Sequence, residues 1–197
     1  MSLPHLDLTA IVETLGLGGL CLVIFAESGL FFGFFLPGDS LLFSAGLLSA
    51  TGVFDIWQLV VFVSVCAILG DSVGFWFGKK VGPKIFSRDD SRFFRKSHVE
   101  KTKKFYEKYG SRTIVLARFV PIVRTFAPIL AGVGQMEYGK FISYNIVGGI
   151  AWSFVLIYGG FILGRILPSA GNYITLIALA IILISFLPIA KEFIRKK

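Results

Sequence analysis

Apolar runs separated by short polar segments organise this chain. Residues 55–78, 140–164 and 173–190 are each apolar over a length close to the about 20 residues of helix that cross a bilayer core. We therefore predict three transmembrane helices. Glycines fall at every fourth position within and just after the first of them, which predicts a smooth ridge for close helix packing: Gly70, Gly74, Gly78 and Gly82.

Residues 17–50 form an apolar stretch that is interrupted, unlike the three spans. The stretch contains Glu27 and then the turn-forming sequence Pro37-Gly38-Asp39, after which residues 41–50 lead to the next turn. Those last residues are too few to cross a bilayer as a helix. We predict a re-entrant hairpin with Pro37-Gly38-Asp39 at its bend. A complete span followed by a short interfacial helix is the alternative.

Residues 113–136 form a second interrupted stretch, and this one carries charge. It contains Arg118 and Arg124, and Pro121 and Pro128 break its helical pattern. An arginine at the bilayer centre costs about 2.5–3.5 kcal/mol on insertion scales, and irregular backbone at that depth must be buried in protein or line a wet cavity. We predict a second re-entrant hairpin that holds two positive charges inside the membrane. The alternative is a short cytoplasmic helix whose arginines reach the lipid headgroups.

Composition and charge place these segments in a membrane. The chain is 55% hydrophobic and 16% charged, which is unlike a soluble domain of 197 residues. Its net charge of +8 is concentrated in residues 79–112. Because this basic segment lies between membrane segments, the positive-inside rule explains it better than nucleic-acid binding does. We therefore expect the basic loop and the basic C-terminal tail to be cytoplasmic.

This orientation makes the two halves of the chain oppose each other. The hairpin at residues 17–50 then enters from outside, and the hairpin at residues 113–136 enters from inside. Each is followed by a glycine-rich span. The predicted fold is an all-α polytopic membrane domain over residues 1–197, with two inverted repeats, each a re-entrant hairpin plus a transmembrane helix, and an extra C-terminal transmembrane helix. Inverted repeats with broken helices are typical of transporters.

The charged residues of the hairpins suggest an anion site. Guanidinium groups pair well with phosphate oxygens, so Arg118 and Arg124 suit the phosphate headgroup of a lipid. Glu27 and Asp39 are candidates to balance these charges when no lipid is bound, or to carry a proton. A purely structural ion pair is the alternative for both acids. For Asp71, beside the glycine ridge, we favour a supporting role through a helix-packing hydrogen bond.

The sequence gives little support for metal, cofactor or enzyme chemistry. His5 and His98 stand apart from each other and from any acidic cluster, so we predict no metal site and no cofactor. A lipid phosphatase would need a nucleophile or a set of metal ligands among the membrane residues, and we identify neither in the sequence. Cys21 and Cys66 read as small core residues.

Five motifs in this order resemble the DedA family, also called the SNARE-associated or VTT-domain family. They are Phe25-Ala-Glu27-Ser-Gly29, Pro37-Gly38-Asp39-Ser-Leu41, Gly70-Asp71 with Gly78, Arg118-Phe-Val-Pro121-Ile-Val-Arg124, and Ala131-Gly132. The resemblance implies an integral membrane lipid transporter or scramblase. It also implies that Glu27, Asp39, Arg118 and Arg124 are the functional residues, with Pro37, Gly38, Asp71 and Pro121 supporting them.

The resemblance and the charged hairpins together give a leading hypothesis. We expect a protein that moves an anionic lipid phosphate, with undecaprenyl phosphate favoured, across the cytoplasmic membrane, with proton coupling. The alternatives are a less selective scramblase of phospholipids such as phosphatidylethanolamine, and an assembly factor that transports nothing. The expected partners are a lipid with a phosphate headgroup and protons, without nucleic acid. A homodimer is compatible with this layout.

Overall fold

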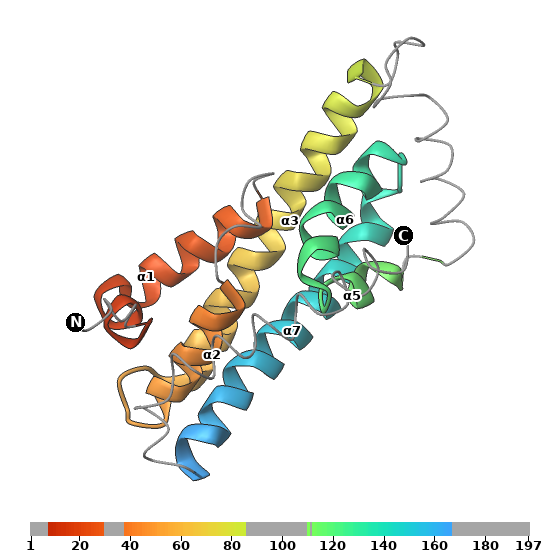
Figure 1. The fold of residues 1–197 in the computed structure, drawn as a ribbon. Helices are drawn as coiled ribbons and strands as arrows, with labels where there is room; N and C mark the ends of the chain where they lie inside the picture. The colour runs from red at the N-terminus through yellow and green to blue at the C-terminus, as the bar shows by residue number, and fades with distance from the viewer. Residues whose placement is uncertain (1–7, 30–37, 86–109, 111, 167–197) are drawn as a thin grey trace, which may run out of the picture. The chain divides into compact units, whose positions relative to one another are not determined.

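The structure of this chain is a computed structural model that describes residues 8–29, 38–85, 110 and 112–166 (Figure 1). The regular structure of these residues is entirely helical, as predicted. Its six helices are α1 (Leu8–Gly29), α2 (Gly38–Ser49), α3 (Ile56–Ile85), α5 (Thr113–Ala117), α6 (Pro121–Val133) and α7 (Tyr138–Ile166). Pro37, most of the basic loop at 79–112, the predicted span at 173–190 and the C-terminal tail lie outside the described residues.

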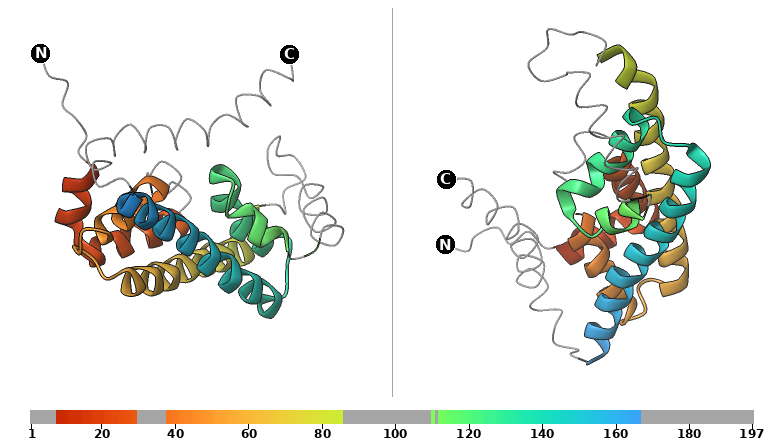
Figure 2. Two further views of the ribbon diagram at one scale, coloured as in Figure 1. Left: turned by 90° about the horizontal axis from the view of Figure 1, so that it is seen from below. Right: turned by 90° about the vertical axis from the view of Figure 1, so that its right-hand side faces the viewer.

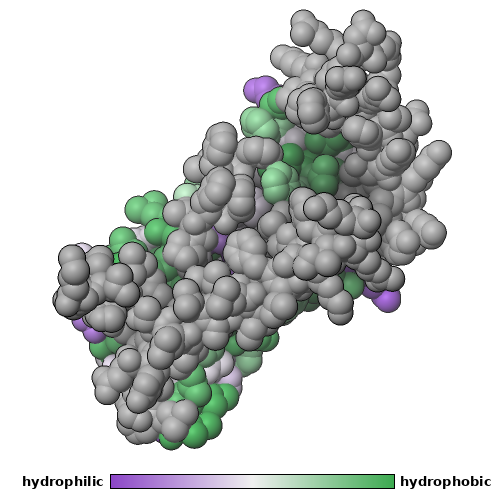
Figure 3. Space-filling model, in the orientation of Figure 1, coloured by the Kyte–Doolittle hydropathy of each residue, from purple (hydrophilic) through white to green (hydrophobic). Residues whose placement is uncertain are grey.

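Three of the described helices are long and apolar enough to cross a membrane. These segments are Ile11–Gly29, Ile56–Gly82 and Tyr138–Ile166. The last two coincide with the spans predicted at 55–78 and 140–164. Large apolar side chains of α3 are exposed, among them Trp57, Phe62 and Leu69, and much of the coloured surface in Figure 3 is hydrophobic. Such a surface suits lipid contact, and the chain is a multi-pass membrane protein.

Helix α1 is broken near its start. Gly16 has φ 59° and ψ −171°, a conformation that glycine adopts easily and that is not helical. The break separates residues 8–15 from the apolar helix that ends at Gly29. Because Ile11–Gly29 is long enough to span a membrane, the alternative given above for this region, a complete span, stands beside the re-entrant hairpin. Helix α2 begins at Gly38, and Asp39 lies in its first turn.

The chain forms two compact units, which we describe separately. The first contains residues 1–20, 37–61 and 153–197. In it, α2 packs closely on the last part of α7. Gly160 lies against the backbone of Phe43 and Leu47, and Gly164 lies against Ala50. The glycines let the two backbones approach, as expected for membrane helices.

The second unit contains residues 21–36 and 62–152. Its core includes Phe75 of α3, which stacks on Phe141 of α7 with ring centroids 4.5 Å apart. Just before α7 begins, close to Phe141 in the chain, the chain arrives from α6 through a tight turn. Gln135 has φ 58° there, and Met136 donates a backbone hydrogen bond of 3.0 Å to Ala131.

The predicted glycine ridge of α3 is confirmed, and two helices pack on it. Phe25 and Gly29 of α1 lie against Gly70, and Ser28 lies near Gly74. The last turn of α1 therefore packs on this part of the ridge. Gly70 is close to the middle of the 30-residue helix α3, and α1 consequently ends there.

Helix α6 packs farther along the same ridge. Gly78 lies against Ile129, and Gly82 lies against Val133. Helix α6 therefore runs in the direction of α3, and its first residues lie toward the middle of α3. Figure 2 shows α6 alongside the later half of α3 in both views. The end of α1 and the start of α6 are thus both brought to the central part of a spanning helix.

The two prolines of residues 113–136 behave differently. Helix α5 ends at Ala117, and Pro121 is the first residue of α6, a position where its missing N–H costs nothing. The predicted break at Pro121 is therefore confirmed. The predicted break at Pro128 is wrong, because Pro128 lies inside α6, which continues to Val133. Proline removes one helical hydrogen bond, and here the surrounding turns continue without it.

Candidate functional site

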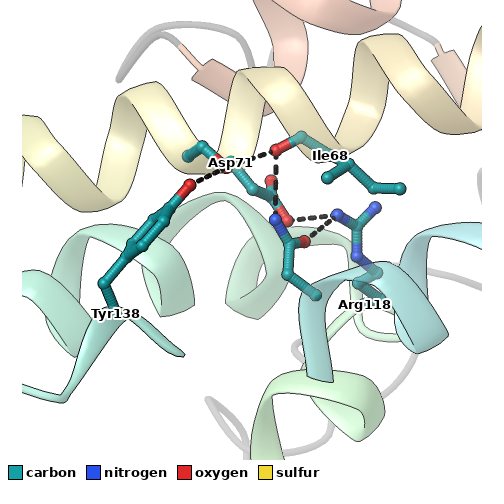
Figure 4. Close-up of polar contacts among 6 residues, drawn as sticks. Ile68, Asp71, Arg118 and Tyr138 are labelled. Carbon is teal, nitrogen blue, oxygen red and sulfur yellow. Dashed lines mark hydrogen bonds and ion pairs between the residues drawn. The ribbon is translucent and has the colours of Figure 1, made fainter. Parts of the chain in front are cut away.

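Arg118 is one of the buried charges of the second unit. It lies directly after α5 and is 5% exposed. Its Nη2 donates to Oδ2 of Asp71 on α3 and to Oδ1 of Asn145 on α7. Figure 4 shows the guanidinium pointing toward α3 and Asp71. The carboxylate of α3 therefore balances the positive charge inside the protein, and the amide of α7 accepts a further hydrogen bond from it.

Asn145 links this pair to the backbone. It is fully buried, and its Nδ2 donates a 3.1 Å hydrogen bond to the carbonyl oxygen of Ile68. With one end on Arg118 and the other on α3, the amide has a fixed orientation. Ser72, one residue after Asp71, donates to the same carbonyl at 2.8 Å. The result is a short polar network near the centre of α3.

Glycines on α7 make room for the Arg118 side chain. A methyl group on Gly148 would lie 3.1 Å from Cδ of Arg118, and one on Gly149 would lie 3.5 Å from Cζ of Arg118 and 2.8 Å from Ile68. Both glycines belong to the glycine-rich span predicted at 140–164. The absence of side chains at these two positions leaves room for the Arg118 side chain against α7.

Asp71 marks the depth of this network. It lies fifteen residues after Ile56 and eleven before Gly82, the ends of the candidate span of α3. A span of that length crosses the hydrocarbon core with residues to spare. The Arg118–Asp71 pair therefore lies near the middle of a membrane-spanning segment, where an unpaired charge is expensive.

Arg124 forms a second buried ion pair, with Glu27. The pair joins the fourth residue of α6 to the end of α1, since Glu27 lies two residues before Gly29. The side chain of Arg124 is 13% exposed and that of Glu27 is 4% exposed. The guanidinium also lies over the ring of Trp152 on α7, with Cζ 4.8 Å from the ring centroid. A carboxylate and an aromatic face thus hold the same cation.

The start of α6 adds a partial positive charge to this site. Its N-cap residue, Val120, offers no side-chain hydrogen bond, so the first backbone N–H groups have no side-chain cap. The macrodipole of a 13-residue helix favours an anion at this end and disfavours the cation of Arg124. Glu27 satisfies that preference, and a phosphate group would satisfy it equally well.

Some buried donors of this unit have no hydrogen-bond partner. They include Nε of Arg118 and Oγ1 of Thr125, which is 2% exposed. Buried polar atoms in folded proteins are normally paired. One of these donors belongs to Arg118 and the other follows Arg124 in the chain. The site therefore has more hydrogen-bonding capacity than its own residues use.

The sequence predictions for the site have mixed outcomes. Glu27, predicted as a candidate to balance the arginines, pairs with Arg124, and its role in transport stays a prediction. The carboxylate partner of Arg118 is Asp71, for which we had favoured a packing hydrogen bond, and not Glu27 or Asp39. Asp39 belongs to the first unit, and its part in the site stays a prediction.

Three supporting residues were also predicted. Gly38 and Pro121 are the first residues of α2 and α6, and Pro37 lies outside the described residues.

Two residues of the site were missed from the sequence. Asn145 and Trp152 both lie in the predicted span at 140–164, where we considered only the glycines. The signal for Asn145 was a polar side chain inside an apolar run, which is rare enough to suggest a partner. The signal for Trp152 was weaker, since aromatic residues are common in this chain.

Metal ligation is not evident in the described part of the chain. Residues 8–29, 38–85, 110 and 112–166 contain no group of three or more His, Cys, Asp or Glu side chains that could hold a metal ion.

Comparison with known proteins identifies the family. Residues 36–162 match the VTT domain. The chain belongs to the DedA family of VTT-domain proteins. The matched region contains Asp39, Asp71 and both arginines, whereas Glu27 precedes it. The resemblance that the sequence motifs suggested is therefore confirmed.

Several DedA-family relatives are similar over most of their length. Protein DedA of Escherichia coli K12 is 46% identical over 180 residues, which cover 90% of this chain and 82% of the relative. An uncharacterized membrane protein of Mycobacterium tuberculosis H37Rv is 45% identical over 174 residues, 87% of this chain and 76% of the relative. Inner membrane protein YqjA of Escherichia coli K12 is 30% identical over 146 residues, 74% and 66% respectively. No solved structure matches the chain.

Proposed function

We propose that this DedA-family protein translocates an anionic lipid phosphate across the cytoplasmic membrane, with undecaprenyl phosphate as the favoured substrate. The observation that carries the proposal is the pair of buried arginines at the centre of the second unit. Each is neutralised by a carboxylate, Arg118 by Asp71 and Arg124 by Glu27. Two fixed cations in an apolar protein suit a substrate that brings negative charge into the membrane.

A phosphate can replace a carboxylate at this site without leaving a charge exposed. Removing one partner of a buried ion pair costs about 3–5 kcal/mol, because the other charge stays buried. Exchange of one anion for another avoids that cost. A phosphate has more acceptor oxygens than a carboxylate and could also accept from Nε of Arg118 and Oγ1 of Thr125.

The Arg124–Glu27 pair is the better candidate for this exchange. Its two residues lie near helix ends, and Arg124 is more exposed than Arg118. Arg118 is held by two helices through Asp71 and Asn145. We propose that Arg118 supplies a fixed positive potential and a contact, and that Arg124 exchanges Glu27 for the lipid phosphate.

Glu27 gives this exchange a route to proton coupling. A carboxylate that leaves its arginine inside an apolar environment is unstable as an anion and favours taking a proton. Lipid binding would then accompany proton uptake at Glu27, and lipid release would accompany proton loss. Asp39 stays a candidate for a second carboxylate of this cycle.

The same features argue against the alternative of an assembly factor. A helical bundle that only scaffolds other proteins gains nothing from arginines at a depth where each costs about 2.5–3.5 kcal/mol. The convergence of the α1 end and the α6 start on the middle of α3 supports broken helices at the site, which is the transporter arrangement. We further propose two inverted repeats, and a basic loop and C-terminus that face the cytoplasm.

The proposal is tested by conservative substitution of the arginines. Arg118→Lys and Arg124→Lys keep the charge but lose the planar fork that binds phosphate at two points. Charge-assisted hydrogen bonds contribute about 1.5–3 kcal/mol, so we expect each variant to lower translocation of a fluorescent polyprenyl phosphate in proteoliposomes by about 10- to 100-fold.

Arg165→Lys is the matched control. Arg165 is an exposed arginine at the end of α7, with Cζ 5.3 Å from the ring centroid of Phe161. The Arg165→Lys variant should translocate the fluorescent polyprenyl phosphate at the wild-type rate. Wild-type rates in both Arg118→Lys and Arg124→Lys, with normal protein levels, would contradict phosphate recognition by these residues.

A further inference from the structure

We propose that Trp152 is a positioning residue for Arg124, holding the guanidinium in place while the carboxylate of Glu27 gives way to a lipid phosphate. The inference rests on the proposed function, and it adds a residue and a specific role to that site. Trp152 lies on α7, is 5% exposed, and presents its ring to Arg124 with Cζ 4.8 Å from the centroid.

The geometry of a guanidinium makes this role separate from anion binding. Its five N–H donors lie in the plane of the group, so carboxylate or phosphate oxygens approach Arg124 from the edge. An aromatic ring contacts the face instead. Because Cζ of Arg124 lies over the Trp152 ring and Nη2 donates to Glu27, we infer that the two contacts use the face and the edge of the group. Exchange of the anion at the edge does not require the stack on the face to break.

The second arginine of the site shows why such a support matters. Arg118 is oriented by hydrogen bonds to Asp71 and Asn145. Both bonds start from Nη2, in the plane of the group. Arg124 instead has part of its support on its face, a contact that uses none of its in-plane N–H donors. Trp152 thus does for Arg124, without using donors, what Asn145 does for Arg118.

Placement before the ligand arrives raises affinity. A long arginine side chain has many rotamers, and the entropy lost when one of them is fixed on binding weakens the affinity. A guanidinium already seated on Trp152 has lost that freedom in advance. Cation–π contacts of desolvated groups are also stronger than exposed ones. Loss of the ring should consequently weaken phosphate binding, whereas binding of an uncharged lipid chain should not change.

The test measures binding of farnesyl phosphate and of farnesol to the purified full chain in phosphatidylcholine nanodiscs. Wild-type protein should prefer the phosphate. We expect Trp152→Leu to weaken farnesyl phosphate binding by about 2- to 30-fold and to leave farnesol binding unchanged. Trp152→Phe keeps a weaker aromatic face, so its affinity for farnesyl phosphate should lie between those of the wild type and Trp152→Leu.

Trp76→Leu is the matched control. Trp76 also has a cation over its ring, since Nζ of Lys79 lies 5.2 Å from the centroid, but that cation belongs to neither ion pair. Its removal should leave both affinities unchanged.

The outcomes separate this inference from the proposed function. No preference of the wild type for the phosphate would overturn the proposed function, and the inference with it. A wild-type preference together with unchanged farnesyl phosphate binding in Trp152→Leu, or an equal loss for phosphate and farnesol, would overturn the inference alone. If Trp152→Leu does not fold, Trp152→Phe decides, and wild-type affinity for farnesyl phosphate in that variant counts against the inference.

Discussion

Replacing Asp71 by asparagine should destabilise the protein, because it leaves the guanidinium of Arg118 without a counter-charge. Both side chains are 5% exposed, so little water reaches the unpaired guanidinium to compensate for the lost ion pair. Breaking a buried pair from one side costs about 3–5 kcal/mol. The introduced amide and Asn145 can still accept hydrogen bonds from Arg118, so we expect the lower end, about 3 kcal/mol.

This loss converts into a measurable shift in melting temperature. For a chain of about 150–250 residues, 1 kcal/mol shifts Tm by about 2–4 °C. Asp71→Asn should therefore lower the Tm of the detergent-solubilised protein by about 6–12 °C. The Tm is measured from the fraction of protein that stays in a monodisperse size-exclusion peak after heating. The double variant Asp71→Asn with Arg118→Gln removes both charges and should recover most of the loss.

Asp55→Asn is the matched control for Asp71→Asn. Asp55 is exposed, and its Oδ1 accepts a 2.8 Å hydrogen bond from the backbone N–H of Gln58 at the start of α3. Asparagine caps helices about as well as aspartate, so Tm should barely change. Asp71 is not the stabilising counter-charge of Arg118 if Asp71→Asn is no less stable than Asp55→Asn, or if the double variant is no more stable than Asp71→Asn.

Three further predictions follow from the site and the topology. Glu27→Gln keeps size but not titration, and it should abolish the pH dependence of transport while lipid binding persists; a wild-type pH profile would contradict this. Gly148→Ala crowds the neighbouring arginine and should lower transport several-fold and stability by about 1–3 kcal/mol, whereas Gly139→Ala on the same helix, with only a 3.7 Å neighbour, should change neither. Single cysteines at Ser97 and Asn172, in a background without other cysteines, should be labelled from opposite sides of the membrane, and labelling from one side would rule out the proposed topology.

The sequence predicted the helices better than it predicted their contacts. Apolar length alone located α3 and α7, because a bilayer imposes a minimum span. Glycine spacing alone predicted the ridge of α3, because close approach of membrane helices needs small residues. The continuation of α6 through Pro128 was not predicted, since a proline rule describes an isolated helix and not one supported by neighbours.

The pairing of charges needed the three-dimensional arrangement. The sequence supplied two arginines and three acids, but periodicity does not say which acid meets which arginine. The packing of the end of α1 and of α6 on the same ridge of α3 brings Glu27 to Arg124, and the position of α5 brings Arg118 to Asp71. Asn145 can be recognised in the sequence as a polar residue in an apolar span, but the sequence does not identify Arg118 as its partner.

Transport of a lipid phosphate by the wild-type protein tests the central claim most directly. Purified protein is reconstituted into liposomes that carry a trace of fluorescent polyprenyl phosphate, fluorescent polyprenol or fluorescent phosphatidylethanolamine, and a membrane-impermeant quencher reports movement between leaflets. We expect protein-dependent movement of the polyprenyl phosphate, faster than that of either other lipid and responsive to a proton gradient. Equal rates for all three lipids would indicate a general scramblase, and no protein-dependent movement of the polyprenyl phosphate would contradict the proposed function.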